Sequence, residues 1–232
     1  MRRFIGMLAF VGLWWGSGMV SYAASPVLIP IHVIIDAGHG GVDGGASYQN
    51  LLEKEINLQI AKLLYTKLNQ QGYQVVLNRS GDYALSEENN WLNSFSRHLR
   101  DLAQRKHLAA ELQAEMMVSI HANWASNPTK RGPLVLYQKN NQSFMLADMI
   151  QHSLNHVYKV KEEPIQGGRY YLLKQSLCPT VIVEIGYLSN AQDRQWMTNP
   201  KQQAILADAI ATAISEYFIL VGEMEPARET TT

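Results

Sequence analysis

The sequence predicts an α/β fold: a single domain of three layers, in which helices flank a twisted sheet that is mostly parallel or mixed. Short β-branched or apolar runs alternate along the chain with longer stretches of helical periodicity. In addition, 47% of the residues are hydrophobic and only 17% are charged, and no low-complexity tract interrupts them. This composition is typical of one packed core rather than of a disordered or fibrous chain.

Five apolar runs are expected to form the strands, and several are continuous enough to be buried on both faces of a sheet. They are residues 31–35, 74–77, 116–120, 134–137 and 181–185. Helices are expected between and after them, because apolar residues recur there at helical spacing. These helical stripes cover residues 58–68, 99–112, 144–157 and 205–218.

The two ends of the chain differ from the rest. Residues 4–20 carry no charge, follow Arg2 and Arg3, and precede the small residues of a cleavage site after Ala23, which is the layout of a secretory signal. The alternative is an uncleaved membrane anchor through residues 4–20, although this run is just shorter than the ~18 residues that span a bilayer. We therefore expect an exported protein.

Three parts of the chain are expected from this pattern. They are a signal peptide or N-terminal anchor at 1–25, one functional domain at 26–222 and a polar, disordered tail at 223–232.

Charge and cysteine content narrow the functional classes. The chain has 20 basic and 20 acidic residues, so a basic surface that binds nucleic acid is not expected. The single cysteine, Cys178, excludes an intramolecular disulfide and a cysteine-based zinc cluster, and we expect it to be a buried small residue. Any metal in this chain, which we expect to be monomeric, must therefore be held by histidines and carboxylates.

A glycine-rich loop follows the first expected strand and presents His39. Its sequence is Asp36-Ala37-Gly38-His39-Gly40-Gly41-Val42-Asp43-Gly44-Gly45-Ala46. Glycines allow positive φ angles and close backbone approach to a ligand or metal. A nucleotide site is rejected, because the loop lacks the Lys-Ser/Thr ending of a P-loop and does not match the G-x-G-x-x-G spacing.

Two further candidate ligands come from other segments. Glu53 lies at the head of the first helix, where an acidic residue alone commonly serves only the helix dipole. His121 ends the third expected strand, and the carboxyl ends of parallel neighbouring strands meet at one edge of a sheet. Either histidine alone is more simply a core residue bonded to backbone. Together, His39, His121 and a carboxylate match a catalytic zinc pattern with an open fourth position.

Glu184 lies inside the apolar strand at 181–185. Burying a carboxylate there is costly unless it is paired or has a chemical task. A buried salt bridge is the structural alternative, but no lysine or arginine nearby in the sequence is an obvious partner. A carboxylate of raised pKa beside a metal could take a proton from water and pass it to a leaving amine.

These four segments, in this order, resemble the zinc-dependent N-acetylmuramoyl-L-alanine amidases of type 3, and the resemblance covers residues 33–218. It implies that His39, Glu53 and His121 bind Zn²⁺ and that Glu184 is the catalytic carboxylate. It also implies a peptidoglycan substrate, cut at the amide bond between N-acetylmuramic acid and the L-alanine of the stem peptide.

The compact plan most resembles the germination-specific amidases of spore-forming bacteria, since neither a regulatory helical insertion nor a wall-binding repeat is visible. A role in spore cortex maturation or germination is the implied setting. Two alternatives stay open: a catalytically silent peptidoglycan-binding module, and a zinc peptidase that cuts within the stem peptide.

Several features remain without an assigned role. Lys174 occupies a position where the family often has arginine, and residues 81–95 could shape a groove or be an exposed connection. His152 and His156 are expected to be an exposed helical pair rather than a second metal site.

Neighbours of the candidate ligands could orient them, although turn formation explains an aspartate in the loop equally well. These neighbours are Asp36, Asp43 and Asn123. His98 and His107 are expected to be solvated.

Overall fold

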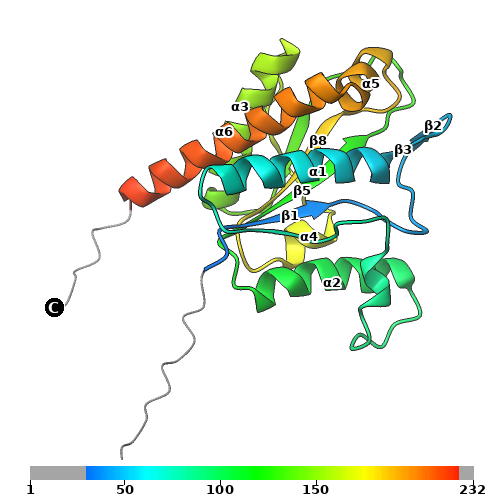
Figure 1. The fold of residues 1–232 in the computed structure, drawn as a ribbon, viewed down its shortest axis with the longest axis vertical. Helices are drawn as coiled ribbons and strands as arrows, with labels where there is room; N and C mark the ends of the chain where they lie inside the picture. Colours follow the sequence, from blue (N-terminus) through cyan, green and yellow to red (C-terminus); the bar gives the residue numbers. More distant parts are fainter. Residues whose placement is uncertain (1–29, 225–232) are drawn as a thin grey trace, which may run out of the picture.

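Six strands form one mixed sheet in the computed structural model, which describes residues 30–224 (Figure 1). The strand order is β4-β1-β5-β8-β6-β7. Strand β6 runs antiparallel to β8, whereas the other neighbouring pairs are parallel. The strands are β1 Val33–Ala37, β4 Val75–Leu77, β5 Met116–Asn123, β6 Leu134–Tyr137, β7 Ile165–Gln166 and β8 Thr180–Tyr187. The expected α/β class with a mixed sheet is confirmed.

Helices cover both faces of this sheet and complete three layers (Figure 1). One face carries α1 Glu53–Gln70, α3 Asn141–Tyr158 and α6 Pro200–Met224. The other carries α2 Arg97–Glu111 and the short α4 Tyr171–Gln175. The remaining elements are α5 Ala191–Thr198, the 3₁₀ turn η1 Leu85–Glu87, and a small hairpin of β2 Ser47–Tyr48 and β3 Leu51–Leu52.

The alternation of side chains along β1 explains the two-sided core. Val33 and Ile35 pack into the large cluster with the apolar faces of α1, α3 and α6. Ile34 points to the opposite face and packs with Met117 and the apolar residues of α2 and α4. Because both faces are covered, these strands can be continuously apolar, which made them visible in the sequence.

Helix α6 is the longest and most apolar helix among the described residues. Its Pro200–Gly222 segment is long and apolar enough to cross a membrane by length and composition alone. Leu206, Ile210 and Ile214 are nevertheless fully buried in the main cluster. Its apolar character is therefore accounted for by the core of this domain.

The expected elements are present with shifted ends, and some elements were not predicted. Strands β5 and β8 continue two to three residues beyond their expected ends. The β2–β3 hairpin, β7, α4 and α5 were missed, because two to eight residues carry too little periodicity. The expected signal or anchor at 1–25 lies outside the described residues, as does the tail from 225 on, while α6 includes the first two residues of the expected tail.

Candidate active site

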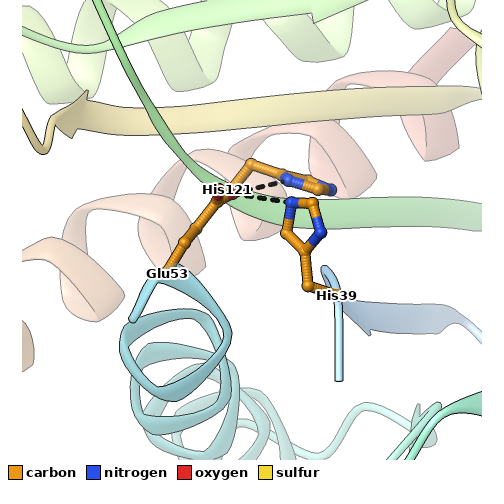
Figure 2. Close-up of side chains that lie close together, drawn as sticks. All are labelled: His39, Glu53 and His121. Atoms are coloured by element: carbon orange, nitrogen blue, oxygen red, sulfur yellow. Dashed lines mark hydrogen bonds and ion pairs between the residues drawn. The ribbon is translucent and has the colours of Figure 1, made fainter. Parts of the chain in front are cut away.

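The carboxyl ends of β1 and β5 and the first turn of α1 bring three donor side chains together (Figure 2). His39 follows β1, His121 lies in β5, and Glu53 is the first residue of α1. One ligand atom from each lies within 4.8 Å of the other two. The strands are parallel neighbours, as the convergence of the two histidines required.

Glu53 is held at the centre of this group by contacts from several segments. Its Oε1 lies 2.9 Å from Nδ1 of His121 and 3.2 Å from Nε2 of His39. The backbone N–H groups of Ala46 and Ala122 donate to its two oxygens at 2.7 and 3.1 Å. Burial opposes ionisation, but the two histidines hold the pKa of Glu53 well below its usual range. Glu53 is therefore a fixed, ionised carboxylate rather than only a partner of the helix dipole.

His39 is oriented by a carboxylate on each side of its ring. Asp43 accepts at 2.8 Å from Nδ1, which leaves Nε2 facing Glu53. Burial lowers the pKa of His39, but Glu53 and Asp43 together raise it to about 9. An outer carboxylate of this kind fixes the ring of a metal-binding histidine, so the expected orienting role suits Asp43.

The loop glycines let the backbone approach the donor side chains. A Cβ atom on Gly45, whose φ is +67°, would lie 2.5 Å from Glu53 Oε2 and 2.6 Å from His39 Cδ2. A Cβ atom on Gly38 would lie 2.3 Å from the ring of His121. Space therefore requires glycine at both positions, and at Gly45 the positive φ requires it as well.

A buried ion pair supports the loop from below. Asp36 is fully buried, forms no hydrogen bond or ion pair with the three donors, and pairs at 2.7 Å with Nη1 of Arg105 from α2. The same guanidinium donates to the carbonyl of His39 at 2.8 Å. Asp36 therefore acts on the donors indirectly, through Arg105, which fixes the backbone of His39.

Arg79 is a second buried support that sequence reasoning missed. It donates from its guanidinium to the carbonyl oxygens of Ala37, Gly38 and Lys54, which come from the histidine loop and from α1. Its position two residues after β4 was the only available signal.

Glu184 lies opposite His121 in the parallel register of β5 and β8. It is only 8% exposed and forms no ion pair with any residue between 30 and 224, so the structural alternative of a buried salt bridge does not hold. Burial raises the pKa of Glu184 to about 7, assisted by the charge of Glu53 and opposed by His121 and His39. A carboxyl group of such pKa can both accept and donate a proton near neutral pH.

These side chains line one cleft of about 520 Å³. Its walls also include Trp124, which directly follows β5, and Arg169 and Tyr170, which precede α4. No role was predicted for these three residues, because a turn and a strand end have no sequence motif of their own.

Comparison with known proteins identifies the family. Residues 33–216 match the family described as N-acetylmuramoyl-L-alanine amidase. This chain belongs to that family.

Two curated relatives of this amidase-family chain come from Bacillus subtilis strain 168. The N-acetylmuramoyl-L-alanine amidase LytC is 35% identical over 187 residues, which cover 79% of this chain but only 34% of LytC. The germination-specific N-acetylmuramoyl-L-alanine amidase is 30% identical over 197 residues, which cover 82% of this chain and 81% of that protein. The resemblance found in the sequence is thus confirmed, and relatives include cell wall and germination amidases.

A solved structure gives the same result for the amidase fold. The CwlD amidase from Clostridioides difficile, determined in complex with the GerS lipoprotein, matches with a TM-score of 0.76 and 32% identity. The match covers 82% of this chain and 98% of that one.

Other candidate residues of this amidase-family chain lie apart from the donors or contact them indirectly. Asn123 accepts from the backbone of Trp124 rather than orienting a donor side chain. His98, expected to be only solvated, is exposed but lines the cleft. Lys174 is exposed on α4 and does not line the cleft.

The remaining candidate residues do not line the cleft. His152 and His156 are exposed along a separate groove between α3 and α6, as expected. Cys178 is buried, also as expected. In the 81–95 segment, Trp91 packs against His107 and donates to Gln104 of α2, so this segment is pinned to the helix.

Proposed function

We propose that this chain is a zinc-dependent hydrolase of peptidoglycan, cutting the amide bond between the lactyl group of N-acetylmuramic acid and L-alanine of the stem peptide. The observation that carries the proposal is the buried, unpaired Glu184 beside the His39–Glu53–His121 donor set in one cleft. Membership of the amidase family supports this bond as the target.

The donor set suits zinc. Two imidazoles and one carboxylate with an open position form a catalytic zinc arrangement, and the three donor atoms lie within 4.8 Å of one another. The hydrogen bond from His39 to Asp43 provides the outer support that such ligands need. When bound, the ion would act as a Lewis acid on the scissile carbonyl and lower the pKa of a water molecule.

Glu184 is the group that we assign to proton transfer. As the carboxylate it accepts a proton from the attacking water, and as the acid it delivers that proton to the nitrogen of the leaving L-alanine. Burial at the floor of the cleft, which raises its pKa to about 7, makes both forms accessible near neutral pH. Glu53 cannot share this task, because its hydrogen bonds from two histidines and two backbone groups keep it ionised.

The cellular setting is a finer proposal. We assign residues 26–222 to the catalytic domain and residues 1–25 to export or anchoring, with action outside the cytoplasm. Similarity to the germination-specific amidase of Bacillus subtilis and to CwlD supports a substrate in the spore cortex. A lipoprotein partner, as in the CwlD complex, is an extension of the same proposal.

The test is product identification on purified muropeptides, with zinc content measured on the same preparation. The expected products are a peptide with a free L-alanine amino terminus and an intact N-acetylmuramic acid. Shortened stem peptides that remain attached to the sugar would show a peptidase instead. Binding without any product, together with no zinc and no activity after zinc addition, would show a silent binding module.

The cortex assignment needs a separate comparison. Digests of spore cortex and of vegetative wall are compared by mass spectrometry at equal enzyme concentration. Faster release from cortex is expected, and equal or slower release would contradict the cortex setting while leaving the amidase assignment in place.

A further inference from the structure

Arg169 differs from every other charged side chain that lines the cleft. Five of these groups are held in ion pairs within the protein: Asp36, Asp43, Glu53, Asp101 and Arg105. Glu184 is the buried acid described above. Arg169 is exposed, and it has neither an ion pair nor a hydrogen bond with another residue between 30 and 224. A positive charge is therefore free to meet a ligand at the wall of the cleft.

The turn that presents Arg169 is anchored on both sides. Before it, the N–H of Gly167 donates to the carbonyl of Tyr137 in β6 at 3.0 Å, and the N–H of Tyr170 closes the turn onto Gly167 at 3.2 Å. A Cβ atom on Gly167 would lie 2.1 Å from Leu173, so the turn packs directly on α4. The backbone of Arg169 is thus fixed relative to the sheet, and its side chain lines the cleft.

The charge of the cleft explains why a free cation there matters. The carboxylates that line the cleft are paired within the protein or, in the case of Glu184, buried, so Arg169 is left free to attract an anionic ligand. The stem peptide is such a ligand. Its second residue is commonly D-glutamate joined through the side-chain carboxyl group, which leaves an α-carboxylate free, and diaminopimelate at the third position adds the carboxylate of its side chain.

We propose that Arg169 is a specificity residue that binds a carboxylate of the stem peptide. The inference rests on the proposed function for the identity of the ligand. A guanidinium suits this role because it can donate two parallel hydrogen bonds to one carboxylate. The carboxylate is either the α-carboxylate of the second residue or the side-chain carboxylate of the third residue. The experiment below separates the two.

The test compares muramyl tripeptides that differ only in one charge. The parent has L-alanine, D-glutamate and diaminopimelate, and each of two analogues carries one carboxamide, in place of either the α-carboxylate of D-glutamate or the side-chain carboxylate of diaminopimelate. The kcat/KM of each is measured for the unchanged protein, Arg169→Gln, Arg169→Lys and Lys174→Gln. Lys174 is the matched control, because it is an exposed cation of the adjoining helix that does not line the cleft.

The unchanged protein is expected to prefer the parent over one analogue by about tenfold. In Arg169→Gln the ratio of the two kcat/KM values falls to near one. In Arg169→Lys part of the preference returns, and in Lys174→Gln it is unchanged. The analogue that the unchanged protein cuts less efficiently than the parent lacks the carboxylate that Arg169 binds. The proposal is overturned if the unchanged protein has no preference, or if Arg169→Gln keeps it.

Binding of the free tripeptides without the sugar separates this inference from the proposed function. Calorimetry is used for the same charge pairs and variants, so no hydrolysis is needed. If no muramyl substrate is cut but the parent peptide binds more tightly in an Arg169-dependent manner, the amidase assignment fails and the carboxylate site stands. If substrates are cut, but peptide affinity depends neither on Arg169 nor on the carboxylate that the analogue lacks, only the inference about Arg169 fails.

Discussion

In the proposed zinc site, protons and the metal compete for His39. Against the effect of burial, Glu53 and Asp43 raise the pKa of His39 to about 9, so the ring of the metal-free protein is protonated at pH 7. Zinc binds only the neutral imidazole, so binding must release that proton.

We therefore expect zinc binding at pH 7 to release about one proton and the affinity to rise up to about tenfold per pH unit toward pH 9. Calorimetry in buffers of different ionisation enthalpy measures the release. Asp43→Asn, which removes one of the two carboxylates, should release less than the unchanged protein. Zinc binding without proton release at pH 7 would contradict the assigned state of His39.

Glu184 should make the metal-free protein less stable as the pH rises. Its pKa is raised to about 7 in the folded chain from an ordinary value of 4.5, so the folded state binds more protons than the unfolded state between these values. The free energy of unfolding then falls across this window and stays reduced above it.

Glu184→Gln removes this cost, and we expect it to stabilise the metal-free protein at pH 8 by about 3 kcal/mol at most, with little gain near pH 4.5. Urea unfolding at both pH values measures the difference. The exposed Glu163→Gln is the matched control. An equal effect of Glu184→Gln at the two pH values would mean that the carboxyl is not held at a raised pKa.

At the scale of the elements, the loop after β1 and the start of α1 approach each other closely enough for one methyl group to matter. We expect Gly45→Ala to weaken zinc affinity by at least about tenfold, because its Cβ atom would displace both Glu53 and His39. Gly44→Ala is the matched control, since its Cβ atom would lie in ordinary contact, 3.6 Å from the side chain of Leu52. Equal zinc affinity of the two variants would show that the loop can move without cost.

The Arg105 support links α2 to β1 and to the His39 backbone. Arg105→Met leaves Asp36 buried without its ion-pair partner, and we expect a loss of about 3–5 kcal/mol in the free energy of unfolding together with weaker zinc binding. Lys106→Met, on the same helix, should change either quantity little. If both variants unfold at the same urea concentration, the pair does not support the site.

The sequence could predict those parts of the site whose chemistry is local. His39 and His121 were placed by the strands they follow or end, because apolar strands between helices indicate parallel neighbours. Arg105 could not be assigned a role in this way, because its partner Asp36 is 69 positions away and only the packing of α2 against the sheet brings them together. Arg169 was missed for a related reason: the turn and the five-residue α4 have no periodicity to locate them.

At the scale of the whole molecule, the sheet order places the candidate catalytic and metal-binding residues at the carboxyl ends of the central strands. Strands β1, β5 and β8 are consecutive parallel neighbours, so their carboxyl ends deliver His39, His121 and Glu184 to the same cleft. Helices cover both faces of the sheet (Figure 1) and leave this edge for the ligand. The net charge of zero predicted that nucleic acid is not the partner. The proposed recognition element is instead a single charge, that of Arg169, for a carboxylate of the stem peptide.

We propose that Glu184 transfers the proton while the His39–Glu53–His121 set holds zinc. The most direct test measures release of peptides with a free L-alanine amino terminus from purified muropeptides by Glu184→Gln, with zinc content determined on the same sample. We predict zinc at the level of the unchanged protein and a loss in kcat of about 10²–10⁴-fold. Full activity in Glu184→Gln with zinc bound would show that Glu184 does not transfer the proton.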